Sequence, residues 1–183
     1  MDFTLQIPER VSTLARQAEE GLGPQFARID AIAQANSRRV LAAFQKHRVA
    51  EAYFAGTTGY GYDDLGRVKL DEIYAGLFGT EDALVRLQFV NGTHAIACAL
   101  FGALKAGDVL VSAVGAPYDT LLGVVGAVDK GHGSLKDYGV EYRQVELVDD
   151  APDRAGLAEA VADPRVKAVL IQRSRGYATR ASL

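Results

Sequence analysis

The pattern of apolar and polar positions divides the chain into a helical first part and an alternating remainder. Residues 9–48 repeat apolar side chains at helical spacing, and the Gly-Leu-Gly-Pro sequence at 21–24 predicts a break between two helices. The second helix is amphipathic. Its apolar stripe consists of Phe26, Ile29, Ala33, Val40 and Phe44. Such an arm is expected to pack on the rest of the protein or on a second subunit.

The remainder of the chain alternates short apolar runs with helical patterns. The apolar runs predict strands at 84–90, 109–113 and 166–172, and an alternating pattern predicts another at 141–148. The helical patterns predict helices at 68–78, 95–104, 121–128 and 152–162. This order is typical of an α/β fold, in which a mostly parallel sheet is flanked by helices. Ligands of such folds bind beyond the carboxyl ends of the strands.

Composition and charge narrow the class of function. The chain has 183 residues, of which 49% are hydrophobic and 23% charged, as expected of a soluble domain with a sizeable core. The formal net charge of −3 favours neither a nucleic-acid partner nor a membrane surface. The sequence contains no apolar run that could span a bilayer and no signal peptide, so we expect a cytoplasmic protein. The single cysteine, Cys98, excludes an internal disulfide and is expected to be a buried thiol.

Three loops follow predicted strands and carry candidate chemistry. The turn Asn91-Gly92-Thr93-His94 joins a strand to a helix, and the free amides at such a helix start favour an anion such as phosphate. An ordinary capped turn is the alternative. The loop at 115–120 contains Tyr118. The loop at 173–180 contains three arginines, which could bind a carboxylate or phosphate or could simply be solvated.

A fourth loop carries candidate ligand-binding residues, and several common catalytic motifs are missing from the sequence. The Gly-rich segment 54–67 carries Tyr60, Tyr62 and Arg67 and is either a surface loop or a loop that contacts a ligand. The sequence lacks the dinucleotide-binding and P-loop glycine motifs and the nucleophile elbow of hydrolases. Its three histidines stand too far apart to suggest a metal site.

Four stretches of the chain resemble the N-terminal part of the fold-type I pyridoxal-phosphate enzymes. More narrowly, they resemble the methionine γ-lyase-like family that is often described as aluminium resistance proteins, which are relatives of the cystathionine lyases. The stretches are TTGYGYDDLGR (57–67), FVNGTHAIACAL (89–100), GAPYDTL (115–121) and IQRSRGYATR (171–180). The resemblance implies an aspartate aminotransferase-like fold, with an N-terminal helical arm at 1–56 and part of the large cofactor-binding domain at 57–183.

The resemblance also implies roles for individual residues toward pyridoxal 5'-phosphate. The turn of Gly92, Thr93 and His94 would hold the phosphate, and Tyr118 would stack on the pyridine ring. Tyr60 and Tyr62 of the Tyr-rich loop would reach the site of a neighbouring subunit. Arg173 and Arg175 would bind the substrate carboxylate. The cystathionine lyases have Tyr-x-Arg in the Tyr-rich loop, whereas Arg67 of this chain lies further from the tyrosines. They have Ser-Gly-Met at the turn where this chain has Asn-Gly-Thr, so a hydroxyl contact is expected to move to Thr93.

The activity implied by the resemblance is that of a carbon–sulfur lyase that acts on a sulfur amino acid by α-proton abstraction and β- or γ-elimination, in a homodimer or homotetramer. None of the chain's lysines at 105, 130, 136 and 167 matches the family's Schiff-base lysine, so we expect surface lysines, no catalytic residue, and a fragment that is inactive alone. Two alternatives remain. One is a non-catalytic module that binds a phosphate ligand or serves oligomerisation, and the other is a sugar-phosphate or nucleotide enzyme.

Overall fold

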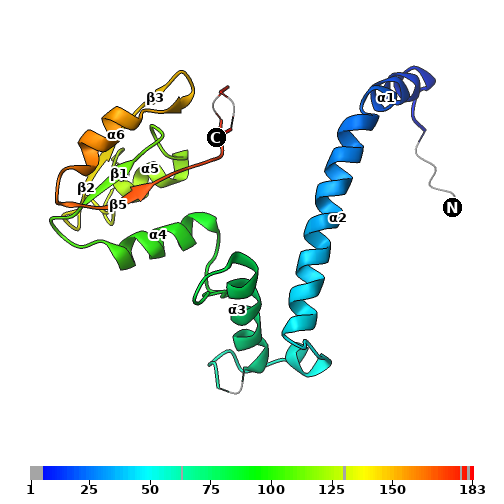
Figure 1. Ribbon diagram of the computed structural model, residues 1–183, viewed down its shortest axis with the longest axis horizontal. Coiled ribbons are helices and arrows are strands. Elements are labelled where there is room, and N and C mark those ends of the chain that lie inside the picture. Colours follow the sequence, from blue (N-terminus) through cyan, green and yellow to red (C-terminus); the bar gives the residue numbers. More distant parts are fainter. Residues whose placement is uncertain (1–5, 63, 130, 178, 181) are drawn as a thin grey trace. The chain divides into compact units, whose positions relative to one another are not determined.

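The chain folds into two compact units, one ending at Arg86 and the other beginning at Leu87. The structure is a computed structural model that describes residues 6–62, 64–129, 131–177, 179–180 and 182–183 (Figure 1). We describe each unit by itself. The division into an arm at 1–56 and a larger domain at 57–183 stays a prediction.

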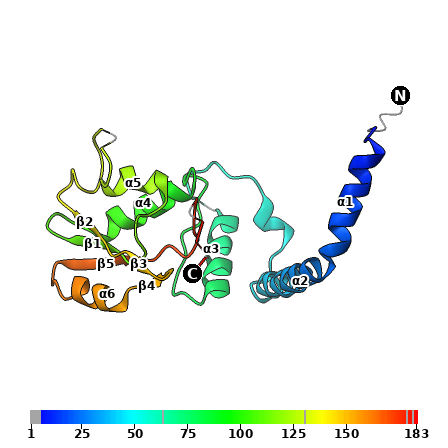
Figure 2. The same ribbon diagram turned by 90° about the horizontal axis from the view of Figure 1, so that it is seen from above.

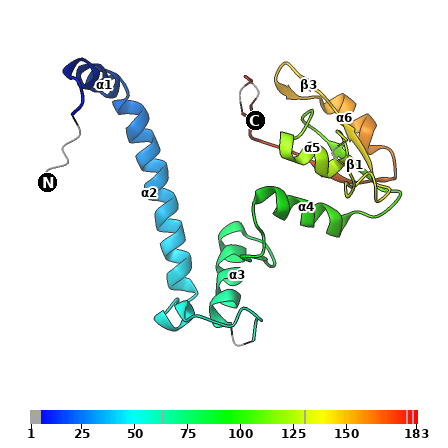
Figure 3. The same cartoon turned by 180° about the vertical axis from the view of Figure 1, so that it is seen from behind.

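The N-terminal unit is helical, as its apolar spacing predicts. It contains α1 (Glu9–Gly21), α2 (Gly23–Lys46), the short 3-10 helix η1 (Glu51–Phe54) and α3 (Leu65–Phe78). The predicted break falls at Leu22, and Pro24 occupies the first turn of α2, where its missing N–H costs no helical hydrogen bond. Figures 1 and 3 show α2 as one continuous helix.

The start of α3 differs from the prediction at Val68. The side chain of Asp64 accepts a hydrogen bond of 3.0 Å from the amide of Arg67, so the helix begins at Leu65. Arg67 therefore lies in the first helical turn and not in the preceding loop. The loop that carries Tyr60 and Tyr62 is shorter than its glycines suggested.

The prediction of a strand at 84–90 is wrong, because none of these residues is in a strand. The amide of Val85 donates to Asp71 of α3 at 2.8 Å, and the side chain of Arg86 pairs with the same carboxylate at 2.7 Å. Leu87 is 100% exposed. A side chain of α3 thus takes the hydrogen bond that a neighbouring strand would have made.

The C-terminal unit is built on a parallel sheet in which β1 (Val109–Ser112) lies between β2 (Glu141–Gln144) and β5 (Val166–Leu170). All four residues of β1 are buried, which agrees with the uninterrupted apolar run of a central parallel strand. The chain passes from β1 to β2 on one side and then back to β5 on the other. The carboxyl ends of β1 and β5 are therefore neighbours.

Three helices cover this sheet: α4 (Gly92–Ala103), α5 (Asp119–Val125) and α6 (Arg154–Val161). Figure 2 shows α4 and α5 on one face of the sheet and α6 on the other. The hydrophobic core between α4, α5 and the sheet consists of Leu100, Leu104, Leu110, Val125, Leu135 and Val140. The prediction of an α/β fold with a parallel sheet flanked by helices is confirmed.

Two local predictions in this unit are corrected. The run 141–148 is not one strand, because β2 ends at Gln144 and a separate hairpin pairs β3 (Leu147–Val148) with β4 (Ala151–Pro152). Asp149 and Asp150 turn this hairpin with φ values of 51° and 58°, as a two-residue hairpin turn requires. Cys98 is exposed and not buried, because α4 turns Leu100 and not Cys98 toward the core.

Candidate functional site

The loops that follow β1 and β5 meet at the carboxyl edge of the sheet, where a parallel α/β fold places its ligands. The amide of Tyr118, after β1, donates to the side chain of Gln172, after β5, at 2.8 Å. The rings of Tyr118 and Tyr177 stack with centroids 5.4 Å apart and an interplanar angle of 29°. The hydroxyl of Tyr118 donates to that of Tyr177 at 3.0 Å, and this hydrogen bond raises the pKa of Tyr118.

The turn predicted at 91–94 is the cap and first turn of α4, which begins at Gly92 and not at Ala95, and it has the amides that the sequence predicts. The side chain of Asn91 caps the helix by accepting from the amide of His94 at 2.9 Å, and His94 Nδ1 accepts from the amide of Val90 at 3.2 Å. The amides of Gly92 and Thr93 are the first two of the helix and have no carbonyl acceptor within it. A Cβ atom at Gly92 would meet nothing within 4 Å, so the backbone there is open to a ligand.

A pair of hydroxyl groups links this turn to the loop of Tyr118. Thr93 Oγ1 and Thr120 Oγ1 are 2.7 Å apart, which places the first turn of α4 beside the first turn of α5. Tyr118 immediately precedes α5. The structure therefore brings the turn of Gly92 and Thr93 close to the loop of Tyr118. The predicted roles of these residues in binding a phosphate and an aromatic ring stay predictions.

Hydrogen bonds of Ser112 and Gly115 fix the start of the loop after β1. Ser112 is buried and its hydroxyl donates to the carbonyl of Gly115 at 2.6 Å, while the amide of Gly115 donates to Val145 at 2.8 Å. Gly115 has φ of +74°, and a Cβ there would lie 2.8 Å from a carboxylate oxygen of Glu146. This position therefore requires glycine, which fixes the path of the chain toward Tyr118.

The arginines of the segment after β5 are at the surface. Arg173 and Arg175 are both exposed, and Arg175 donates to the carbonyl of Arg180 at 3.4 Å. Guanidinium groups in this position can meet a carboxylate that arrives from solvent. Their expected role in binding the substrate stays a prediction.

The remaining predicted residues lie outside this group. Tyr60 and Tyr62 belong to the N-terminal unit and are 83% and 82% exposed, so their expected contact with a neighbouring subunit stays a prediction. Of the four lysines predicted to be at the surface, Lys105, Lys136 and Lys167 are exposed, as predicted. Lys130 lies outside the described residues.

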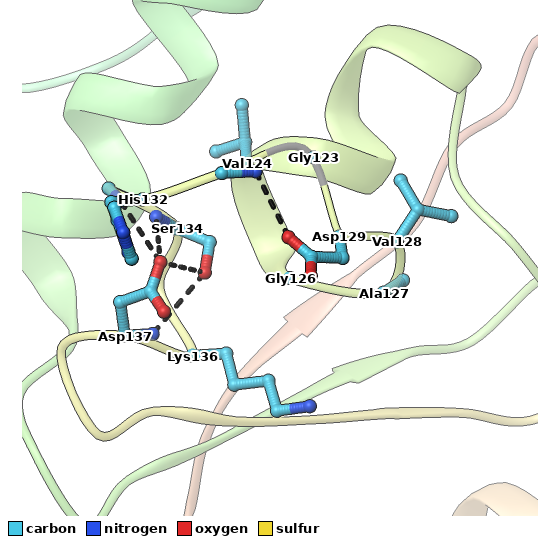
Figure 4. Close-up of a pocket in the computed structure, with 12 residues that line it drawn as sticks. Gly123, Val124, Gly126, Ala127, Val128, Asp129, His132, Ser134, Lys136 and Asp137 are labelled. Atoms are coloured by element: carbon cyan, nitrogen blue, oxygen red, sulfur yellow. Dashed lines mark hydrogen bonds between the residues drawn. The ribbon is translucent and has the colours of Figure 1, made fainter.

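A hollow of about 450 Å³ lies between α5 and the Gly-rich loop that follows it (Figure 4). Asp137 accepts from the amides of Gly133 and Ser134, both at 2.9 Å, and from the hydroxyl of Ser134 at 2.8 Å. Asp129 accepts from the amide of Gly131 at 3.0 Å. Because the loop's own carboxylates occupy these donors, the hollow offers no open cradle for an anion. None of the predicted site residues lines it.

Sequence reasoning missed three residues of the site: Thr120, Gln172 and Tyr177. All three lie in the stretches at 115–120 and 171–180, whose arginines and Tyr118 carry the more obvious chemistry. The adjacency of β1 and β5 places the loop of Gln172 and Tyr177 against that of Tyr118, and no local sequence signal contains this adjacency.

The described residues contain neither a membrane-spanning helix nor a cluster of metal ligands. No helix in that part of the chain is both long and apolar enough to cross a membrane. No group of three or more His, Cys, Asp or Glu side chains there could hold a metal ion.

The fold and the site define an α/β protein in which a helix start with free amides lies beside the loop of an aromatic side chain at the carboxyl edge of a parallel sheet. Comparison with known proteins makes the assignment specific. The chain belongs to the methionine gamma-lyase family, which it matches over residues 11–183.

Similar proteins agree with this family. An uncharacterized protein of Bacillus subtilis, YnbB, is 43% identical over 180 residues, which are 98% of this chain and 43% of YnbB. A Clostridium acetobutylicum structure, proposed to be a cystathionine beta-lyase involved in aluminum resistance, is 46% identical with a TM-score of 0.89, over 97% of this chain and 42% of that one. A carbon-sulfur lyase involved in aluminum resistance from Clostridium novyi is 44% identical with a TM-score of 0.85, over 92% and 41%. The chain thus spans less than half the length of these relatives.

Proposed function

We propose that the complete protein is a pyridoxal-phosphate-dependent carbon–sulfur lyase that removes the α-proton of a sulfur amino acid and eliminates its sulfur group. The observation that carries this proposal is the contact of 2.7 Å between Thr93 and Thr120, which joins the open amides of α4 to the loop of Tyr118. The names of the similar proteins support the reaction class.

The residues present fit such a cofactor on chemical grounds. A phosphate needs hydrogen-bond donors and positive potential, and the first turn of α4 supplies both through the amides of Gly92 and Thr93. The open space beside Gly92 gives backbone access. A flat heteroaromatic ring needs an aromatic or apolar face, which Tyr118 supplies.

The chain's own residues would bind and orient, because no candidate acid or base of the reaction is assigned within it. Gly92 and Thr93 would fix the phosphate end through their open amides, and Tyr118 would fix the plane of the ring. His94, predicted for the same role, has its amide and Nδ1 occupied by Asn91 and Val90 and would help by holding the turn. Arg173 and Arg175 would meet the carboxylate of the amino-acid substrate. The chemistry that the cofactor supplies when bound is an electron sink, which makes loss of the α-proton possible.

Two further expectations belong to this proposal. Tyr60 and Tyr62 would contact the phosphate in a neighbouring subunit, so the protein would be a homodimer or homotetramer. The exposed apolar side chains of α1 and α2 support such an association, since a second subunit could cover them. A cytoplasmic location and the inactivity of the isolated chain also stay proposals.

Titration of the complete protein with pyridoxal phosphate, followed by absorbance, tests the cofactor. Release of an oxo acid from cystathionine and from methionine tests the reaction. We expect Tyr118→Ala to raise the Kd of the cofactor about 2- to 10-fold, the size expected for one aromatic stacking contact.

Tyr138→Phe is the matched control for the titration, because Tyr138 is an exposed tyrosine of the same unit whose ring contacts Phe101. Its Kd should equal that of the unaltered protein. Binding of sugar phosphates or nucleotides in preference to pyridoxal phosphate would overturn the proposal in favour of another phosphate enzyme.

A further inference from the structure

We propose that Tyr177 is a positioning residue of the site: its ring and hydroxyl hold Tyr118 in the orientation that the flat ring of the cofactor requires. This inference rests on the proposed function for the identity of the ligand. Tyr177 lies outside the predicted phosphate-binding turn at 91–94.

Three contacts tie Tyr118 to the short segment after β5, and each fixes a different part of the residue. Gln172 accepts from its backbone amide at 2.8 Å, Tyr177 stacks on its ring at a centroid distance of 5.4 Å, and the Tyr177 hydroxyl accepts from its hydroxyl at 3.0 Å. Backbone, ring plane and ring tip are therefore all determined by one segment. A tyrosine on a loop would otherwise be free to change its χ1 rotamer.

The backbone of the same segment lies close to the Tyr118 ring. Gly176 has φ of +57°, and a Cβ atom there would lie 3.2 Å from Cδ2 of Tyr118. Gln172 is itself fixed, because its side-chain amide donates to the carbonyl of Ser174 at 3.1 Å. The segment is thus folded against Tyr118 and does not merely pass near it.

The contacts of Tyr118 and of Thr120 go to different elements, which separates two tasks. Thr120 contacts the first turn of α4, where the phosphate is expected, whereas Tyr118 is held by the segment after β5. Tyr177 is 80% exposed, so burial of its own surface in a core does not explain its place. A role toward Tyr118 does explain it.

A rival explanation is that Tyr177 occupies the place of the cofactor ring and must leave when the cofactor binds. The two explanations predict opposite effects of removing the ring. If Tyr177 positions Tyr118, its loss weakens cofactor binding, because Tyr118 must then be ordered on binding. If Tyr177 competes, its loss tightens binding.

The experiment titrates the complete protein with pyridoxal phosphate in the variants Tyr177→Ala and Tyr177→Phe. We expect Tyr177→Ala to raise the Kd about 3- to 10-fold, as for loss of one aromatic pair, and Tyr177→Phe to stay within about 3-fold because the stacked ring is retained. Thermal unfolding should be unchanged in both variants. An unchanged or lower Kd in Tyr177→Ala overturns the inference.

A second measurement needs no cofactor. In the apo protein, NMR titration of isotope-labelled tyrosine, with the signal assigned by Tyr118→Phe, reports the pKa of Tyr118 directly. Because the hydrogen bond to Tyr177 raises that pKa, Tyr177→Phe should lower it toward the usual value, and the control Tyr138→Phe should not. An unchanged pKa in Tyr177→Phe overturns the inference.

The two readouts separate this inference from the proposed function. If the unaltered protein does not bind pyridoxal phosphate while Tyr177→Phe lowers the pKa of Tyr118, the proposed function fails and the positioning contact stands. If the protein binds the cofactor and Tyr118→Ala weakens binding while Tyr177→Ala does not, the proposed function stands and the role of Tyr177 fails.

Discussion

The two units of the chain use their apolar side chains in opposite ways. In the C-terminal unit every residue of β1 is buried, and the surrounding core draws on α4, α5 and β2. In the N-terminal unit, Ile73 is the only buried residue among those described, and neither α1 nor α2 buries any. Large apolar residues such as Phe26, Ile29 and Leu41 are exposed along α2.

This difference reflects two ways in which secondary structure is stabilised. A helix can form from its own backbone hydrogen bonds and end residues, whereas a parallel sheet requires side chains distant in sequence to pack on it. The C-terminal unit, which holds the site, therefore has a core that fixes its loops. The apolar stripe of α2 is left for another surface, and we propose that this surface is a second subunit.

The largest effect that tests this contrast is expected from a core substitution. Leu110→Ala removes a side chain at the centre of the buried cluster, so it should lower the free energy of unfolding by about 2–5 kcal/mol. Leu41→Ala removes the same atoms from α2, where Leu41 is 62% exposed, and at protein concentrations that dissociate the subunits it should change the free energy by no more than about 0.5 kcal/mol. Urea unfolding of the complete protein measures both.

A larger effect of Leu41→Ala at higher protein concentration would support the proposed second subunit, because Leu41 would then be covered in the associated protein. The effect should then depend on protein concentration, because dilution favours the dissociated subunits. Leu110→Ala should show no such dependence.

A smaller effect is expected at the main polar contact of the N-terminal unit. Asp71 accepts from Arg86 at 2.7 Å and from the amide of Val85 at 2.8 Å. Asp71→Asn leaves the guanidinium of Arg86 without its carboxylate, and should lower the free energy of local opening of α3, measured by hydrogen exchange, by about 1–3 kcal/mol. Asp30→Asn, on the exposed surface of α2, is the control and should have little effect.

The same pair predicts a dependence on pH. The hydrogen bond from Arg86 lowers the pKa of Asp71, so its contribution is complete above the usual pKa of aspartate and is lost as the pH falls through the lowered folded pKa. The difference between Asp71→Asn and the unaltered protein should therefore shrink as the pH falls below about 4. A difference that is constant across this range would show that the carboxylate charge is not what stabilises the segment.

The sequence predicts the fold where the apolar pattern itself determines the structure. The break at Leu22 and the buried strand β1 follow from local spacing, and both are found. The segment 84–90 has the same apolar character as a strand, but the acceptor of the Val85 amide is Asp71, which lies fourteen positions earlier on another helix. No local pattern contains that contact. The hairpin turn at Asp149 and Asp150 was likewise hidden within a run that alternates like one strand.

The site shows the same division. That Tyr118 would lie at the carboxyl edge follows from the rule for parallel sheets, since its loop follows β1. Among the described residues no strand precedes Gly92, and it is the contact between Thr93 and Thr120 that brings the first turn of α4 to the same edge. The stacking of Tyr177 on Tyr118 depends on the strand order, since only the adjacency of β1 and β5 brings these tyrosines together. Strand order cannot be read from a list of strands.

The smallest effect compares two helix caps, one in each unit. Asp153 caps α6 by accepting from the amides of Ala155 and Gly156, at 3.0 and 3.1 Å. Asp64 caps α3 through the amide of Arg67. Replacing either aspartate with alanine removes a cap that is typically worth about 1 kcal/mol. The difference should lie in where this loss is felt.

Because α6 covers a sheet that depends on its core, Asp153→Ala should lower the free energy of global unfolding by about 1 kcal/mol. In Asp64→Ala the loss should stay local, since α3 belongs to a unit with little core, and should appear as faster hydrogen exchange in the first turn of α3 with unchanged global unfolding. Asparagine at either position retains the capping oxygen, so most of the stability that alanine removes should be kept. If Asp64→Ala lowers global unfolding as much as Asp153→Ala does, α3 unfolds together with the sheet and the two units form one cooperative structure.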